Sequence, residues 1–413
     1  MCIRVSLKTR RPRPHPRGSL PVKPLRILIG ADTYAPDVNG LSRFSSRLAA
    51  GLVERGHEVH VVAPSHDGPG AVREEDGVIV HTVKSHRWFS HPTFRVAWPW
   101  TTRPRTARLF AEIAPDVLHV QGHFPVGRGL VHAARAAGTP IVATNHFMPE
   151  NLVGHARVPK VLQKPVTKIG WWDMHLIYRH ADVVTAPTPR AVELMEKATG
   201  ITGSLAVSCG IDAAKYRGGE PDPSAPTTVL FVGRMDQEKR VDELLRAFAA
   251  LPAGTRAELE VIGEGVMREE WTGLAAELGI GTRTRFRGFV SEEELVAAYR
   301  RASVFCMPGI AELQSLVTLE AMAAGTPVIA ANAMALPHLV RPGRNGWLYT
   351  PGDVPELTTR LAALVGDADM RRRMGAASRE MVAAHELSGT LSTFEGIYER
   401  LSGRREAGAV RAA

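Results

Sequence analysis

Cysteine and long apolar runs are scarce in this 413-residue chain. The three cysteines, Cys2, Cys209 and Cys306, lie far apart, which indicates neither a disulfide framework nor a zinc knuckle and favours a reducing compartment. No apolar run approaches the roughly 20 residues that span a bilayer, and the N-terminus has no apolar block of the signal-peptide kind. We therefore expect a cytoplasmic protein.

Acidic residues are missing from the N-terminal tail. Residues 1–24 carry seven lysines and arginines and no acid, and residues 403–413 carry three arginines and Glu406. These tails account for the whole net charge of +9, so the body between them is neutral, which argues against a nucleic-acid partner. We expect both tails to be disordered, either as solubilising extensions or as weak attachments to anionic lipid.

Also absent is a G-x-G-x-x-G motif after the first strand, which disfavours a redox dinucleotide enzyme.

The chain is longer than one hydrophobic core usually serves, so its length favours two domains. Strands and helices alternate in residues 25–63, and the pattern restarts near Thr228 after a linker rich in Pro, Gly and Ser. This alternation predicts α/β domains with parallel strands between helices.

The most informative stretch is the segment 303–327. It predicts a buried strand at 304–307, a loop at 308–315 and a helix at 316–324. The first amides of such a helix bind anions such as phosphate.

Two acids, Glu312 and Glu320, stand on either side of these amides. This arrangement suits a sugar nucleotide, with the amides on the diphosphate, Glu320 on ribose hydroxyls and Glu312 on the sugar. The alternative is a solvated loop and helix face.

Two cations follow the strand predicted at 228–232. Gly233 allows a ligand to approach the backbone closely, and Arg234 and Lys239 come next. A leaving diphosphate gains negative charge as the glycosidic bond breaks, so cations at this point would stabilise it. Surface ion pairs are the alternative role for the two cations.

Polar side chains follow two strands expected in the N-terminal half, at 117–120 and 141–144. Parallel strands end at one edge of a sheet, where open α/β sheets hold ligands. Another loop ends in Asn39 and Gly40 just before a helix, where glycine lets the backbone approach a phosphate. For each of the edge side chains the alternative is a structural, hydrogen-bonded role. They are His119, Gln121, His123, Asn145 and His146.

Residues 149–179 mix cations with aromatic and aliphatic side chains. Such a surface suits an anionic membrane, with apolar groups inserted and lysines at the headgroups. The competing interpretation is an amphipathic helix whose apolar side packs on its own domain. The cationic and aromatic members are Lys160, Lys164, Lys168, Trp171 and Trp172.

Together these motifs resemble a known family. The E-x7-E spacing of Glu312 and Glu320 and the strings EAMAAGTPVIA, NGWLYTPGD and GRMDQEK are similar to the retaining glycosyltransferases of family 4, which have the GT-B fold. The string NHFMPEN and the segment after it resemble the branch that glucosylates diacylglycerol. The match covers most of residues 25–402.

The resemblance implies two doubly wound Rossmann-like domains that face each other across a deep cleft. The bounds that we expect are 25–207 for an acceptor-binding domain, 208–390 for a domain that binds the nucleotide sugar, and 391–402 for a terminal helix that packs back on the first domain. A tail follows at 403–413.

The resemblance also implies roles for residues. Arg234 and Lys239 would bind the donor diphosphate, Glu312 the sugar hydroxyls, and Gly40 would lie near both diphosphate and acceptor. His123 would orient the acceptor or assist as a base. The family pattern E-G-F-G is replaced here at residues 312–315, which we interpret as substrate tuning. The other donor-binding candidates are Gly233, Gly263, Val290, Gln314, Ser315, Leu316, Val317 and Glu320, and the other acceptor-binding candidates are Asn39, Asn145 and His146.

The implied reaction moves a hexose from a nucleotide-diphosphate sugar, with UDP-glucose favoured, to a hydroxyl of a membrane lipid such as diacylglycerol. It uses no metal and no cofactor besides the donor. The D-x-D pair of Asp367 and Asp369 is interpreted as the charged start of a helix. One alternative is a mannosyltransferase that uses GDP-mannose on a phosphoinositide or a soluble glycan. Another, of a different class, is a catalytically silent subunit that binds nucleotide sugars.

Overall fold

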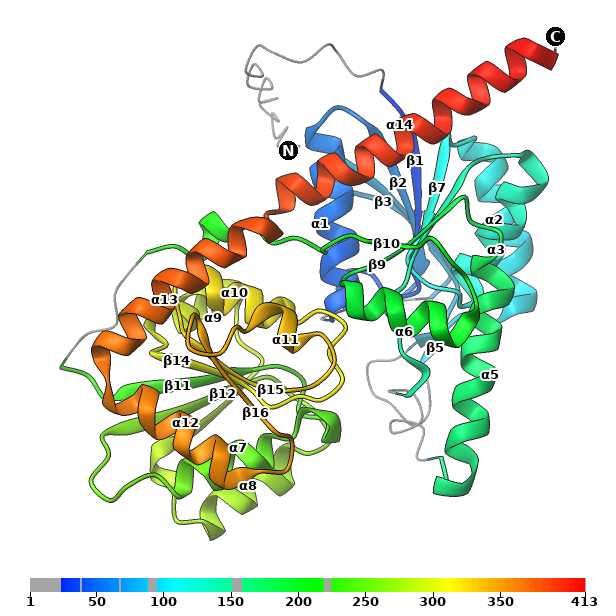
Figure 1. Cartoon of the computed structure of the whole chain (residues 1–413). Helices are drawn as coiled ribbons and strands as arrows, with labels where there is room; N and C mark the ends of the chain where they lie inside the picture. The colour runs from blue at the N-terminus through cyan, green and yellow to red at the C-terminus, as the bar shows by residue number, and fades with distance from the viewer. Residues whose placement is uncertain are drawn as a thin grey trace, which may run out of the picture.

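Two separate β-sheets organise the chain, and helices cover both faces of each (Figure 1). The computed structural model describes residues 24–412 apart from 38, 67, 88–94, 151–157 and 219–223, with side chains described as far as Gly403. The basic tail expected at 1–24 therefore lies, except for Pro24, outside the described residues.

The first sheet has eight strands in the order β10-β9-β8-β7-β1-β2-β4-β3. Neighbouring strands are parallel except at the edge, where β3 is antiparallel to β4. A separate two-stranded ribbon pairs β5 with β6. The strands are β1 (Arg26–Gly30), β2 (Glu58–Pro64), β3 (Val72–Glu75), β4 (Val78–Val83), β5 (His86–Arg87), β6 (Arg95–Val96), β7 (Val117–Val120), β8 (Ile141–Thr144), β9 (Val183–Ala186) and β10 (Leu205–Ala206).

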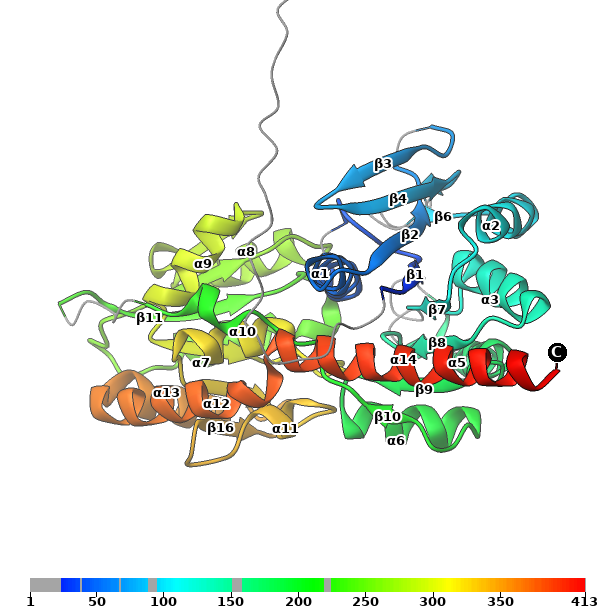
Figure 2. The ribbon, with the colours of Figure 1, turned by 90° about the horizontal axis from the view of Figure 1, so that it is seen from above.

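Both faces of this sheet are buried, as side chains of the central strand β1 show. Ile27 and Ile29 belong to the core that includes α1 and α14, whereas Leu28 belongs to the core on the opposite face, with α2, α3 and α5 (Figure 2). A strand that is apolar on both faces is typical of a parallel sheet between two helix layers. The helices are α1 (Gly40–Glu54), α2 (Pro99–Ile113), α3 (Pro125–Ala137), α5 (Lys160–Tyr178) and α6 (Pro189–Thr199).

The second sheet is parallel throughout, in the order β13-β12-β11-β14-β15-β16. Its strands are β11 (Thr227–Val232), β12 (Ala257–Ile262), β13 (Thr284–Gly288), β14 (Val304–Met307), β15 (Val328–Ala331) and β16 (Gly346–Tyr349). Its helices are α7 (Val241–Ala249), α8 (Arg268–Glu277), α9 (Glu292–Arg301), α10 (Leu316–Ala324), α11 (Leu336–Leu339), α12 (Val354–Gly366) and α13 (Ala368–Val382), with 3-10 turns η1 (Ala213–Tyr216), η2 (Gln237–Lys239), η3 (Gly281–Arg283) and η4 (Ala383–His385).

Two doubly wound, Rossmann-like sheets confirm the predicted fold class. The strand at 304–307 and the helix at 316–324 have the predicted bounds, as do the strands at 117–120 and 141–144. Gly325 ends α10 with φ 84°, the left-handed conformation that favours glycine after a helix.

The chain crosses between the two sheets twice, and the crossings meet. Ile211, after the first sheet, forms a parallel bridge with Glu386, because its N–H donates to the carbonyl of His385 at 2.9 Å and its carbonyl accepts from Leu387 at 2.9 Å. These backbone bonds join the segment around Ile211 that connects the two domains, called the hinge below, to the start of the last helix.

That last helix, α14 (Leu387–Ala412), runs from the second lobe along the first (Figure 1). It begins four residues before the expected 391 and continues through the positions expected as a tail. Phe394 is fully buried between the rings of Phe44, at 6.0 Å, and His119, at 4.9 Å. The helix therefore packs on the first domain. No helix among the described residues is long and apolar enough to cross a bilayer.

We predict that Phe394→Ala destabilises the protein by about 3–5 kcal/mol, because it removes a buried ring and leaves a cavity between α14 and α1. Chemical denaturation followed by circular dichroism measures this change. Phe289→Ala is the matched control, since Phe289 is 67% exposed. Equal stability of the two variants would contradict a docked α14.

Candidate active site

Three neighbouring strands of the second sheet, β12, β11 and β14, end at the same edge and carry the loops with the predicted donor residues. Gly263 directly follows β12 and has φ +133°. A Cβ at this position would lie 1.9 Å from the carbonyl oxygen of Gly233, which follows β11. Only glycine fits there, so the two loops touch through bare backbone.

Within this edge the structure brings Lys239 and Glu312 into a direct ion pair. Both side chains are mostly buried, 15% and 11% exposed. Gly309 lies beside them, since a Cβ there would be 3.3 Å from Oε1 of Glu312 and 3.4 Å from Cδ of Lys239. The Ile310 N–H donates to the carbonyl of Glu238 at 3.0 Å, which joins the two loops.

Arg234 lies in the same loop and pairs with Asp236 at 2.7 Å and with Glu238 at 3.2 Å. It is 41% exposed, so its guanidinium reaches solvent at the edge of the site. Val290, another of the predicted donor-binding residues, is half-buried in the loop after β13, on the far side of β12.

The N-terminus of α10 faces the N-terminus of α1. A Cβ on Gly40 would lie 4.0 Å from Cδ1 of Leu316. Asn39 caps α1 by accepting from Ser42 N–H at 2.9 Å, whereas Ser315 at the start of α10 makes no side-chain cap and instead accepts from a threonine hydroxyl in the helix. The predicted phosphate-binding amides of Leu316 and Val317 thus begin a helix whose N-cap residue, Ser315, does not cap it with its side chain.

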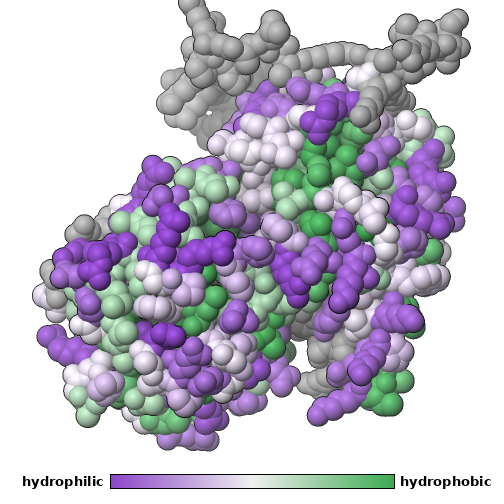
Figure 3. All heavy atoms as spheres, viewed as in Figure 1, coloured by the Kyte–Doolittle hydropathy of each residue, from purple (hydrophilic) through white to green (hydrophobic). Residues whose placement is uncertain are grey.

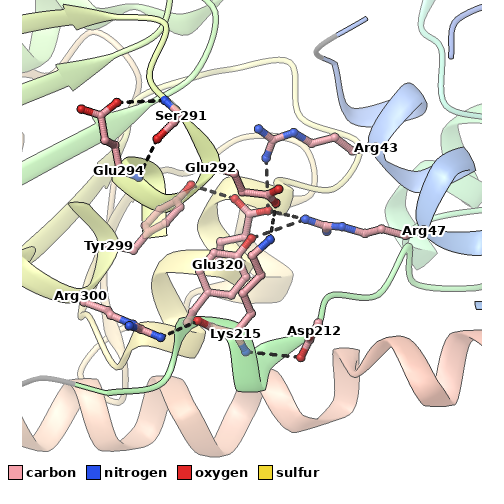
Figure 4. Close-up of polar contacts among 11 residues, drawn as sticks. Arg43, Arg47, Asp212, Lys215, Ser291, Glu292, Glu294, Tyr299, Arg300 and Glu320 are labelled. Atoms are coloured by element: carbon pink, nitrogen blue, oxygen red, sulfur yellow. Dashed lines mark hydrogen bonds and ion pairs between the residues drawn. The ribbon is translucent and has the colours of Figure 1, made fainter. Parts of the chain in front are cut away.

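Glu320 is fully buried where α1 of the first domain meets α10 of the second. Its Oε1 lies 3.0 Å from Arg47 and 3.5 Å from Arg43, and its Oε2 accepts from the hydroxyl of Tyr299 at 3.0 Å. Figure 4 shows both arginines extending from α1 toward this carboxylate. Glu320, which is predicted to bind the ribose of the donor, is therefore held by two arginines of the other domain.

Electrostatics explain why these groups stay together. Burial raises the pKa of Tyr299 and of Tyr216, and the charge on Glu320 raises both further. Burial opposes the charge on Arg47, but the Glu320 carboxylate outweighs this effect and raises the pKa of the guanidinium. The phenols therefore remain protonated as hydrogen-bond donors and Arg47 remains charged.

Gln314 lies at the hinge. Its Oε1 accepts from the N–H of Cys209 at 2.8 Å, and its Nε2 donates to Ser208 Oγ at 2.8 Å. Close by, the Thr188 hydroxyl donates to the carbonyl of Leu313 at 2.9 Å. Residues 313 and 314 thus join the domains in this structure, and both polar ends of Gln314 are taken by the hinge.

Four of the polar candidates at the carboxyl edge of the first sheet are buried, His119, Gln121, His123 and Asn145, and His146 beside them is half-buried. His146 Nε2 lies 2.9 Å from Oε1 of Gln121, and His123 Nε2 lies 3.7 Å from Asp173. Among the described residues, Gln121 Nε2, His123 Nδ1 and Asn145 Nδ2 are buried without a hydrogen-bond partner. Such atoms suit a polar ligand, because a buried polar atom without a hydrogen-bond partner is energetically unfavourable. His119 instead bonds Tyr398 of α14, at 2.6 Å, and is structural.

Sequence reasoning missed Asp32, which lies two residues after the end of β1 at this edge. It accepts from the N–H groups of Val126 and Gly127, at 3.0 and 3.4 Å, and burial raises its pKa to about 6. The rule that polar residues after parallel strands meet at one edge would have found it. Arg43 and Arg47 were also missed, because a helix sequence does not say which element it faces.

The residues of α5 that are predicted to contact a membrane do not all face solvent. The three lysines are exposed and Trp172 is 59% exposed, but Trp171 is 7% exposed and its Nε1 donates to Glu150 at 2.9 Å. Val161, 82% exposed, and Ile169, 61% exposed, lie with the lysines on the outer side. Figure 3 shows hydrophilic and hydrophobic side chains mixed at the lower end of α5. Trp171 therefore packs on its own domain.

No group of three His, Cys, Asp or Glu side chains placed to hold a metal occurs in the described part of the chain. Asp367 of the D-x-D pair caps α13 by accepting from Met370 N–H at 2.8 Å, and Asp369 pairs with Arg372. The interpretation of this pair as a helix start is confirmed.

In the GT-B class of glycosyltransferases, two Rossmann-like domains face each other, and loops at the carboxyl edges of their sheets bind the ligands. The two domains of this chain have this arrangement. The fold matches that of a sucrose-phosphate synthase from Thermosynechococcus elongatus with a TM-score of 0.76, at 21% identity over 92% of this chain and 100% of that one. A family model described as Glycosyltransferase Family 4 matches residues 38–215, and one described as Glycosyl transferases group 1 matches residues 212–381.

Among curated proteins, a GDP-mannose-dependent alpha-mannosyltransferase of Mycolicibacterium smegmatis is 32% identical over 92% of this chain and 99% of its own length. The sulfoquinovosyl transferase SQD2 of Arabidopsis thaliana is 29% identical over 80% of this chain and 64% of its own length. The chain belongs to the family 4 glycosyltransferases, which confirms the family that its motifs resemble.

We predict that stability falls as pH decreases from about 6.5 to 5. Burial lowers the pKa of His119 and His146 to about 3 and that of His123 to about 4, so these rings stay neutral when folded but take up protons when unfolded below about pH 6.5. Each ring contributes up to about 1.4 kcal/mol per pH unit. Asp32 and Asp37, whose pKa values are raised by burial, act in the opposite direction, whereas His81, whose pKa burial lowers to about 4, adds to the effect of the three rings.

Urea unfolding at pH 7.5 and pH 5 measures the effect. Ordinary carboxylates titrate near pH 4, so the upper part of this range reports on the histidines and on Asp32, which opposes them. The midpoint is expected to be lower at pH 5, and less so in His146→Gln. An unchanged midpoint in the unmodified protein would show that these rings are not buried as neutral groups.

Proposed function

We propose that the protein is a retaining hexosyltransferase that takes a nucleotide-diphosphate sugar in its second domain and an acceptor hydroxyl in its first. The observation that carries this proposal is the Lys239–Glu312 ion pair, beside Gly309, at the edge where β11, β12 and β14 end and where Gly233 and Gly263 touch. A cation, a carboxylate and bare backbone at one point suit a diphosphate joined to a sugar.

In the proposed reaction Lys239 leaves its ion pair with Glu312 and pairs with the donor diphosphate. It then neutralises the negative charge that grows on the diphosphate as the bond to the sugar breaks. Glu312, released, accepts from sugar hydroxyls. Arg234, partly exposed at the rim, stabilises the same diphosphate, and the first amides of α10 bind its oxygens. The leaving diphosphate takes the acceptor proton, so neither a protein nucleophile, a metal nor a cofactor is required.

The acceptor is proposed to bind at the edge that holds His123, Asn145 and His146. The unpartnered buried atoms of Gln121, His123 and Asn145 support this, since a hydroxyl group satisfies such atoms. His123 then orients the acceptor. Its pKa, lowered to about 4 by burial, keeps the ring neutral near pH 7, so that it can accept a hydrogen bond from the acceptor hydroxyl.

For the donor two candidates stand. The motif resemblance favours UDP-glucose, and the relatives named as GDP-mannose-dependent mannosyltransferases favour GDP-mannose. For the acceptor, the basic and apolar outer side of α5 supports a membrane lipid such as diacylglycerol or a phosphoinositide, reached from the cytoplasmic face.

We predict hydrolysis of one sugar class in a panel of UDP- and GDP-sugars without acceptor, and a drop in kcat of about 10²–10³ for Lys239→Ala. The measurement is nucleotide release with and without EDTA, and chelation is expected to leave the rate unchanged. Lys197→Ala is the control, because Lys197 is exposed on α6, away from the site.

Loss of turnover in EDTA would contradict the metal-independent mechanism. Tight nucleotide binding without any turnover, even with lipid acceptors added, would favour a silent binding subunit instead.

We also predict that the protein sediments with anionic liposomes and that Ile169→Ala with Trp172→Ala weakens this binding, since both side chains are exposed on α5 beside the lysines. A matched control replaces the exposed side chains Val266 and Phe289 of the second domain with alanine. Sedimentation that is absent, or equally strong in both double variants, would remove the membrane proposal and leave a soluble acceptor.

A further inference from the structure

The contact of Arg43 and Arg47 with Glu320 has no role in the reaction as described so far, and it joins the two domains at the donor site. Glu320 has no exposed side-chain surface, whereas Arg47 and Arg43 are 20% and 31% exposed. A ribose cannot reach this carboxylate while both arginines cover it.

An arginine that leaves a buried carboxylate needs another anion, because an unpaired buried charge is strongly unfavourable. On the second domain, Lys239 already faces Glu312, and Arg234 faces Asp236 and Glu238. Carboxylates thus balance the cations on that side. A diphosphate adds negative charge to this balanced site, so further positive charge must come from across the interface.

The arginines on α1 are placed to supply that charge. Gly40, at the start of the same helix, lies against Leu316 at the uncapped start of α10, where the diphosphate is proposed to bind. Nη1 of Arg47 is buried and has no hydrogen-bond partner among the described residues, so part of its donor capacity is unused. Figure 4 shows that Arg43 and Arg47 approach Glu320 side by side from one face of α1.

We propose that Arg43 and Arg47 are the first domain's contribution to the donor site, and that donor binding exchanges their ion pairs. The ribose hydroxyls replace the arginines on Glu320, and the arginines turn to the diphosphate. This rests on the proposed function. Through this exchange of ion pairs, closure of the two domains around the donor depends on the negative charge of the donor.

Calorimetric titration with UDP, GDP, UMP and GMP tests this exchange. Arg47→Ala is expected to weaken binding of the preferred nucleoside diphosphate by about tenfold or more, the loss of a charge-assisted hydrogen bond. Its effect on the monophosphate is expected to be much smaller, and Arg47→Lys is expected to recover part of the loss.

Arg55→Ala is the matched control. Arg55 directly follows α1 as its C-cap residue, at the opposite end of the helix from Gly40, and it also pairs with a carboxylate, that of Glu395 in α14 at 2.6 Å. It is expected to bind both nucleotides as the unmodified protein does. If Arg47→Ala does not fold, Arg43→Ala, at the more exposed of the two pairs, carries the same expectation.

Equal losses for mono- and diphosphate would show that Arg47 only supports the fold, and an unchanged diphosphate affinity would show that it does not touch the donor; either result overturns the exchange while the proposed function stands. If the unmodified protein binds neither UDP nor GDP, the donor site itself is absent and the proposed function fails.

Discussion

The site depends on one constraint: each buried carboxylate needs a positively charged partner. Glu312 and Glu320 are nearly or fully buried, and a buried charge is tolerated only beside a partner. Each carboxylate takes its partner from a different element: Lys239 from the turn after β11, and Arg47 from α1 of the other domain. Both carboxylates are therefore held in charge-balanced ion pairs, which an anionic ligand must rearrange.

Parallel sheets make this arrangement available. Because neighbouring strands end at one edge, loops that are far apart in the chain meet there, and short backbone segments such as Gly233 and Gly263 bring them into contact. The hinge at Ile211 and the docking of α14 through Phe394 then set how the two edges face each other. Fold and family say what class of reaction takes place, whereas the sugar, the base and the acceptor depend on side chains around the cleft.

Much was readable from the sequence. The bounds of β14 and α10 and the parallel α/β pattern followed from apolar runs and helix stop signals, whereas the resemblance to the family implied that Lys239 and Glu312 act at one donor site. The sequence did not indicate that Gln314 would hold the hinge, that Trp171 would be buried, or that α14 would begin at Leu387. Each of these depends on contacts between residues far apart in the chain.

The sequence by itself determined the local elements and which chemical groups stand at their ends, because periodicity and turn residues act over a few positions. Only the tertiary structure decided which of those groups face one another across the domains. The pairing of Arg47 with Glu320 joins residues 273 positions apart. No local pattern encodes such a pair, since it arises from how two complete sheets and their helices pack.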